Sequence, residues 1–182
     1  SPGIPPSQWP TTDIEIISDI EFAFRVLKSK DVHPKIIGVT GTNGKTTVTA
    51  GLAYVLQTTP YGNIGRPLLL DIESVSSSST LVIELSSFQL AASKSLTCDM
   101  AVILNIEPDH LAWHQTFEAY KQAKLSIVKP NQQLYIKEEL IKSITIPSTT
   151  TIHSIESLER QQFSQFSGEH NQLNASIIVD IA

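Results

Sequence analysis

The segment from Lys35 to Leu56 constrains the fold more strongly than any other part of the sequence. It begins with an apolar, β-branched run, Lys35–Thr40, which is typical of a buried strand. The run breaks into Gly41–Gly44, and a periodic segment follows from Lys45. Apolar side chains recur there at the spacing of a helix with one core face: Val48, Leu52, Val55 and Leu56. Strand, glycine loop and helix in this order predict a βα unit of a parallel sheet.

Further apolar runs predict the rest of the sheet. Two of them lack alternation, as strands covered on both faces do: Thr80–Leu85 and Met100–Asn105. Shorter strands are predicted at Ile14–Ile17 and Leu134–Ile136. Periodicity and capping residues predict the helices: one capped by Ser18 or Asp19 and running to Leu27, then Phe88–Ser95, Thr116–Val128 and His170–Ala182. The alternation predicts an α/β fold with three layers around a mostly parallel sheet.

Length and composition predict a single globular domain. The chain has 182 residues, 41% of them hydrophobic, which suits one domain with a core and excludes wholesale disorder. Prolines and Gly3 make residues 1–13 an irregular lead-in, and we expect the domain to occupy residues 14–182. The pattern is weak over Ile144–Phe166, and Ser74–Ser79 reads as a flexible surface loop.

Charge and cysteine content narrow the class of partners. Thirteen basic against eighteen acidic residues give a net charge of -5, so nothing general attracts nucleic acid or an anionic membrane. The single cysteine, Cys98, has apolar neighbours, and we expect a buried thiol in a reducing cytoplasm. No apolar run reaches the length of a membrane span, and the first residues lack the pattern of a signal peptide. We expect a soluble, unexported monomer.

The glycine loop has the chemistry of a phosphate-binding loop. Its backbone N–H groups, the positive end of the following helix and Lys45 together suit a nucleotide polyphosphate. Thr46 places a hydroxyl where a phosphate-bound Mg²⁺ needs a ligand. The strict motif fails at its first position, where Val39 stands instead of glycine. The alternative is an ordinary strand-to-helix turn with an exposed lysine. The nucleotide-binding residues predicted here are Gly41, Thr42, Asn43, Gly44, Lys45, Thr46 and Thr47.

Acidic and imidazole side chains follow the neighbouring strands. Glu84 ends one predicted strand, and Asp109 and His110 come after the next. Ligands of parallel sheets gather at the carboxyl ends of the strands, so these groups are expected beside the phosphate loop. A magnesium ion would compensate a buried Glu84 carboxylate. The alternatives are a surface glutamate at a strand end and a solvated histidine.

Lys124 lies on the apolar stripe of a predicted helix, in register with Phe117, Tyr120 and Ile127. One explanation is that the side chain extends along the surface to water. The other is that desolvation lowers its pKa, so that the neutral amine reacts with carbon dioxide and becomes a carbamate, an anionic oxygen ligand for Mg²⁺.

Taken together, these residues resemble the Mur ligases, the ATP-dependent amide-forming enzymes that build the peptidoglycan stem peptide. The resemblance rests on five blocks in the family's order: Thr40–Thr47, Glu84–Leu90, Asn105–Leu111, Tyr120–Lys124 and His170–Ala175. Gly62–Gly65 and Ser86–Leu90 are similar to the branch of the family that adds D-glutamate to UDP-N-acetylmuramoyl-L-alanine. The resemblance covers nearly the whole chain, but it corresponds to only one of the family's three domains, the central ATP-binding domain. It therefore implies a fragment whose N-terminal and C-terminal domains are absent, with Ser1–Ile4 at the junction from the first domain.

The resemblance also implies roles for individual residues. Gly44, Lys45 and Thr46 would hold the β- and γ-phosphates, and Lys45, His110 and Lys124 would take part in catalysis. Two magnesium ions are implied, one on Thr46 and Glu84 and a second served by His110 and carbamylated Lys124. Asn171 and Asn174 would recognise adenine, and the alternative for these two residues is a helix cap and a solvated amide. Gly3, Asn63 and Ser86 would lie near the UDP-linked substrate.

Besides the missing domains, two departures from the family stand out. The stretch Gln57–Tyr61 is brief where the family has a longer segment with a strand, which leaves the placement of Asn63 open. Ala112 and Trp113 replace the usual acidic and basic pair. The alternatives to a D-glutamate ligase are another Mur ligase, a folylpolyglutamate synthase, a P-loop kinase or a non-catalytic nucleotide-binding module.

Overall fold

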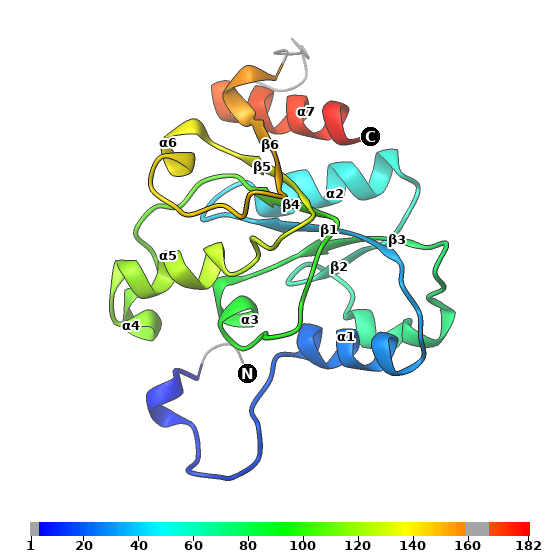
Figure 1. Cartoon of the computed structure of the whole chain (residues 1–182), viewed down its shortest axis with the longest axis vertical. Helices are drawn as coiled ribbons and strands as arrows, with labels where there is room; N and C mark the ends of the chain where they lie inside the picture. Colours follow the sequence, from blue (N-terminus) through cyan, green and yellow to red (C-terminus); the bar gives the residue numbers. More distant parts are fainter. Residues whose placement is uncertain (1–3, 159–167) are drawn as a thin grey trace.

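The computed structural model describes residues 4–158 and 168–182, which form a six-stranded sheet between two layers of helices (Figure 1). The strand order is β2-β3-β1-β4-β5-β6, and every neighbouring pair is parallel. The strands are β1 (Lys35–Thr40), β2 (Pro60–Gly62), β3 (Thr80–Glu84), β4 (Met100–Ile103), β5 (Gln133–Ile136) and β6 (Thr151–Ser154). The predicted three-layer α/β fold is confirmed.

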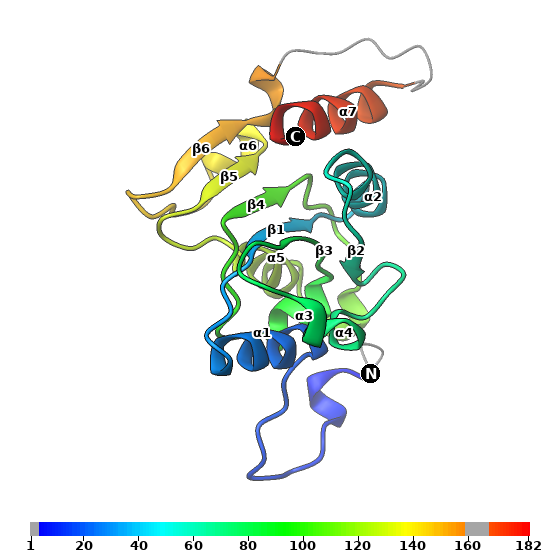
Figure 2. The same cartoon turned by 90° about the vertical axis from the view of Figure 1, so that its right-hand side faces the viewer.

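The helices divide between the two faces of the sheet (Figure 2). The α-helices are α1 (Asp19–Ser29), α2 (Lys45–Val55), α3 (Ser87–Ala91), α4 (Leu111–His114), α5 (Phe117–Leu125), α6 (Glu138–Ile141) and α7 (Glu169–Ile181). Short 3-10 turns are η1 (Pro6–Gln8), η2 (Leu68–Leu70), η3 (Ile72–Ser74) and η4 (Ile155–Ser157). One apolar core joins α1, α3 and α6 to the sheet, and a second core joins α2 and α7 to the opposite face. Within the described residues no helix is both long and apolar enough to cross a bilayer.

The central strands follow the sequence prediction because both of their faces are buried. In β1, β3 and β4, only the first residue of β1 is exposed, as the continuous apolar runs require. Cys98 is buried beside this core, and desolvation raises the pKa of its thiol to about 12. The prediction of a core thiol is confirmed.

The ends of the sheet depart from the sequence prediction. The strand expected at Ile14–Ile17 is wrong, since the segment runs outside the sheet and Ile14 is 78% exposed. β-branched residues without a partner strand do not form a ladder. The edge strands β2 and β6 are short and were not predicted; Pro60 is tolerated in β2 because an edge strand needs fewer backbone donors. The sequence analysis expected no strand in the brief stretch before Asn63, but strand β2 lies there.

The first helix is fixed to the domain by a buried carboxylate. Ser18 caps α1, as predicted, by accepting a hydrogen bond from the Glu21 N–H. The Glu21 side chain is fully buried and accepts from the backbone N–H groups of Lys94 and Ser95, the Ser95 hydroxyl and the Arg25 guanidinium. Helix α3 ends at Ala91, earlier than predicted, and the following turn brings the Lys94 and Ser95 donors to α1.

Candidate functional site

The carboxyl ends of three adjacent strands create the site. Strand β1 lies between β3 and β4, so the loop after β1, the end of β3 and the loop after β4 meet at one edge. The strands that follow β1 in the chain lie on both sides of it, with β2 and β3 on one side and β4 to β6 on the other, and parallel sheets bind ligands at such a point. The phosphate loop, Glu84 and residues 105–110 therefore share one rim.

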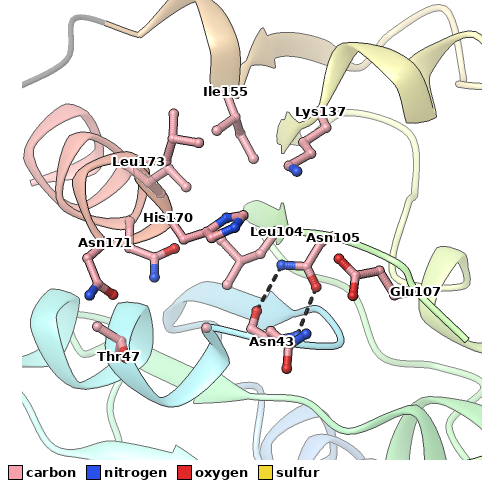
Figure 3. Close-up of a pocket in the computed structure, with 13 residues that line it drawn as sticks. Asn43, Thr47, Leu104, Asn105, Glu107, Lys137, Ile155, His170, Asn171 and Leu173 are labelled. Atoms are coloured by element: carbon pink, nitrogen blue, oxygen red, sulfur yellow. Dashed lines mark hydrogen bonds between the residues drawn. The ribbon is translucent and has the colours of Figure 1, made fainter. Parts of the chain in front are cut away.

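The phosphate loop is braced by the loop after β4. The Asn43 N–H donates to Oδ1 of Asn105 at 2.8 Å, and Asn105 Nδ2 donates back to the Asn43 carbonyl at 3.1 Å (Figure 3). Gly44 precedes α2 with a left-handed φ of 85°, and a Cβ there would lie 3.1 Å from the Asn174 amide. Glycine is needed at this point for backbone conformation and for space.

Lys45 opens α2 beneath the loop. Its Nζ donates to the Thr42 carbonyl at 2.9 Å. Desolvation lowers the pKa of Lys45, although the Glu84 and Asp109 carboxylates oppose the shift by favouring the charged form. The loop thus holds a half-buried amine against its own backbone, at the positive end of α2.

Glu84 is buried at the end of β3 and held on both carboxylate oxygens. Only 1% of the residue is exposed, so the alternative of a surface glutamate is wrong. The Thr46 hydroxyl donates to Oε2 at 2.9 Å, and Asn63 Nδ2 donates to Oε1 at 2.7 Å. The Asn63 N–H also donates to the Glu84 carbonyl. A hydroxyl and a fixed carboxylate beside a phosphate loop are the hard oxygen donors that Mg²⁺ takes together with phosphate oxygens. These residues therefore fit a magnesium ion.

Lys124 points from α5 into the base of the phosphate loop. The residue is 2% exposed, so the alternative that its side chain reaches water is wrong. Its Nζ donates to the Gly41 carbonyl at 2.7 Å and lies 4.9 Å from the centre of the Tyr120 ring. Burial without a carboxylate partner disfavours the ammonium form.

The pKa of Lys124 falls accordingly. Desolvation is the largest cause of its drop to about 7, and the Lys45 cation adds to it, whereas Asp109 and Glu84 act in the opposite sense. The direction agrees with the sequence prediction. The charges that act on the Lys124 pKa, those of Lys45, Glu84 and Asp109, all belong to this edge of the sheet.

His110 lies at the outer side of this group. It caps α4 in a left-handed conformation with φ of 53°, an uncommon state for a non-glycine residue. Its ring contacts Phe88, with centroids 4.8 Å apart, and lies edge-on to Tyr120 at 6.2 Å. The Tyr120 hydroxyl is 2.9 Å from the Thr42 hydroxyl in the phosphate loop. Among the described residues, no three His, Cys, Asp or Glu side chains cluster as a metal site.

A cavity of about 400 Å³ opens beside the phosphate loop. Asn43, Gly44 and Thr47 line one side, and Asn171 and Asn174 of α7 line another. The polar lining residues that were not given roles in the sequence analysis are Asn105, Glu107, Lys137 and His170. Figure 3 shows the Lys137 amine and the His170 ring directed into the cavity. Asn105 and Lys137 each come within two residues of the end of a strand. That position could have indicated in the sequence that they lie at the ligand-binding edge of the sheet.

The three positions expected near the UDP-linked substrate have different surroundings. Asn63 lines a second cavity, of about 500 Å³, between the lead-in and α3. The Ser86 hydroxyl forms a capping box with Gln89 at the start of α3. Gly3 lies outside the described residues.

Comparison with known proteins agrees with this arrangement. The sequence profile of the Mur ligase middle domain matches residues 39–139, which span the phosphate loop, Glu84 and Lys124. The chain belongs to the Mur ligase family. That match covers more than half of the sequence and includes every strand from β2 to β5.

Two curated relatives of this Mur ligase chain are UDP-N-acetylmuramoylalanine--D-glutamate ligases. The protein from Sphingopyxis alaskensis is 34% identical over 96% of this chain and 45% of its own length. The protein from Caldicellulosiruptor bescii is 42% identical over 70% of this chain and 29% of its own length. The chain thus spans less than half of the curated relatives it matches. A solved MurF ligase from Thermotoga maritima in complex with ADP has the same fold, with a TM-score of 0.66 at 18% identity over 96% of this chain and 52% of the other.

Proposed function

We propose that this chain is the ATP-binding part of a ligase that adds D-glutamate to UDP-N-acetylmuramoyl-L-alanine in peptidoglycan precursor synthesis. The observation that carries the proposal is the hydrogen bond from Thr46 to a buried Glu84 beside the Lys45 loop. It joins a phosphate cradle to a carboxylate that suits Mg²⁺. The D-glutamate branch is supported by the names of the curated relatives at 34% and 42% identity.

ATP would occupy the cavity beside the phosphate loop. Backbone N–H groups of the loop and the Lys45 amine would hold the β- and γ-phosphates, with contributions from Thr42, Asn43 and Thr47. Asn171 and Asn174 line the side of the cavity that α7 provides, which suits recognition of the adenine edge by their amides. The free volume of about 400 Å³ lies within the range of small-molecule sites.

Magnesium would be held by Thr46 and Glu84. Such an ion neutralises charge on the phosphate oxygens. The chain's own contribution is a preset arrangement, because Asn63 already orients the Glu84 carboxylate and Lys45 already lies under the loop. A second magnesium would be served by His110 and by Lys124 as its carbamate. The pKa of about 7 supports this modification, since the neutral amine attacks carbon dioxide.

The reaction needs no nucleophile from the protein. A carboxylate oxygen of the substrate would attack the γ-phosphorus and release ADP, giving an acyl phosphate. The neutral amine of D-glutamate would then attack the acyl carbon, form the amide, lose a proton and release phosphate. Lys45 would stabilise charge that develops on the transferring group in the first step.

The domain assignment follows the same proposal. Residues 14–182 would form the central domain, residues 1–13 would lead in from an N-terminal domain, and a C-terminal domain would complete the enzyme. Gly3, Asn63 and Ser86 would lie near the UDP-linked substrate. The complete enzyme would act in the cytoplasm as a monomer, independently of nucleic acid and membrane.

The test is ATP-dependent incorporation of labelled D-glutamate into UDP-N-acetylmuramoyl-L-alanine by the complete protein. We expect amide product and ADP, loss of product in Lys124→Ala, and partial recovery of that variant by a short-chain carboxylic acid that replaces the carbamate. The 182-residue chain alone should bind ATP weakly and form no amide. Use of a different amino acid would indicate another Mur ligase, and phosphoryl transfer without amide formation would indicate a kinase.

A further inference from the structure

A histidine that the proposed function does not use lies at the centre of the aromatic group beside the site. His114 ends α4 and is only 7% exposed. Its Nε2 is 2.9 Å from the Ser87 hydroxyl, and Ser87 is 2% exposed. Ser87 begins α3, three residues after Glu84, so this hydrogen bond ties α4 to the segment that follows the buried carboxylate.

The His114 ring packs against three other aromatic rings. It stacks on Phe88 with centroids 5.7 Å apart and planes 9° from parallel, and it contacts Trp113 at 4.4 Å and Tyr120 at 5.3 Å. Desolvation lowers the pKa of His114 to about 4, so its ring stays neutral at physiological pH. A neutral imidazole suits this apolar enclosure, with the serine satisfying one of its nitrogens.

The same rings reach both groups expected at the second metal. Phe88 contacts His110, and Tyr120 lies beneath the Lys124 amine and beside the phosphate-loop hydroxyl of Thr42. The backbone of α4 adds a direct link, since the His114 N–H donates to the His110 carbonyl at 3.1 Å. A displacement of the His114 ring would therefore move the surfaces against which His110 and Lys124 pack.

We propose that His114, held by Ser87, is a positioning residue that sets the separation of His110 and Lys124 and thereby the second metal site. This inference rests on the proposed function and adds to it two residues, His114 and Ser87, that do not themselves bind the metal. An apolar ring of similar size would fill the space but would leave α4 free to shift on α3, because aromatic packing is less directional than a hydrogen bond.

The experiment compares four variants of the complete protein. His114→Phe and Ser87→Ala remove the hydrogen bond, and His114→Gln keeps an amide that reaches Ser87. Ser126→Ala is the matched control, because the Ser126 hydroxyl bonds only within its own helix end, to the Ala123 carbonyl. Two readouts are used: Mn²⁺ binding to the ATP complex followed by electron paramagnetic resonance, and the Mg²⁺ concentration that gives half-maximal amide formation.

We expect His114→Phe and Ser87→Ala to weaken the second Mn²⁺ and to raise the half-maximal Mg²⁺ concentration about tenfold, a factor equal to about 1.4 kcal/mol. The KM for ATP should change less than kcat. His114→Gln should recover most of the wild-type metal dependence, and Ser126→Ala should match the wild type.

Two results would overturn the positioning role. One is wild-type Mn²⁺ binding in Ser87→Ala, whose small change keeps the protein folded even where His114→Phe does not fold. The other is His114→Gln behaving like His114→Phe, which would indicate that ring packing alone matters. A wild-type protein that binds no ATP with Mn²⁺ would instead contradict the proposed function.

Discussion

Two buried charged residues, Glu21 and Lys124, show how differently two regions of this molecule are built. Glu21 on α1 accepts five hydrogen bonds from three residues, and the Arg25 cation lies beside it. Lys124 at the phosphate loop has a strong hydrogen bond to one carbonyl, with the Thr40 hydroxyl at 3.5 Å. A fully compensated charge stabilises a fold, whereas an undercompensated one is available to a ligand.

The direction of each pKa shift reflects that difference. For Glu21, desolvation is the largest single cause and raises the pKa, but the hydrogen bonds from Ser95, Arg25 and Lys94 together outweigh it and lower the pKa. For Lys124, desolvation prevails and lowers the pKa to about 7. The surroundings of Glu21 therefore favour its charged carboxylate, whereas the surroundings of Lys124 favour its neutral amine.

The largest effect is expected from Lys45→Met, which removes a cation at the ligand-binding edge. Mg·ATP affinity should fall about 100-fold, or about 2.7 kcal/mol, because charge-assisted bonds to phosphate are lost. Isothermal titration of the complete protein measures this. The exposed Lys28 on α1 provides the control, and Lys28→Met should bind as the wild type does. Equal affinity in both variants would mean that the loop does not hold phosphate.

Glu21→Gln should destabilise the fold by about 2 kcal/mol at pH 7, since hydrogen bonds to a buried charge are lost. The folded pKa of Glu21 lies below its ordinary value of 4.5, so its stabilisation is present above pH 4.5 and is lost as the pH falls through the folded pKa. The difference between wild type and variant in urea unfolding should therefore shrink below pH 4.5. A constant difference from pH 7 to pH 3 would contradict the assignment.

Lys124→Met should change the free energy of unfolding by less than about 1 kcal/mol, because relief of desolvation offsets the lost hydrogen bond to Gly41. Amide formation by the complete protein should nevertheless be abolished. Chemical denaturation paired with the D-glutamate assay tests both expectations. A loss of stability as large as that of Glu21→Gln would remove the contrast between the two regions.

Lys94→Ala should leave the unfolding midpoint unchanged. Its ammonium pairs with Glu15 at 2.8 Å, but the Lys94 side chain is 72% exposed, and such pairs are screened by water. The backbone N–H of Lys94 still bonds to Glu21 in the variant. Thermal unfolding at low and high salt checks this, and a salt-dependent loss would show that exposed charges matter in the α1 region after all.

The sequence predicted most of the elements that surround this site. The central strands were predictable because neighbouring residues such as Val82 and Ile83 are both buried although they face different cores, so the run carries no polar alternation. Ile14–Ile17 has similar composition, yet it forms no strand because no neighbouring strand pairs with it. The edge strands β2 and β6 depend on such pairing and were missed.

The candidate site divides in the same way. The chain order of glycines, Lys45 and Thr46 by itself determined the phosphate loop, since a strand, a tight turn and a helix start are local events. The tertiary structure decided what meets that loop: the Asn105 brace, the Asn63 contact with Glu84, the Lys137 amine in the cavity and the Ser87–His114 bond. These groups come from separate strands and helices, and only the packing of the sheet brings them within bonding distance.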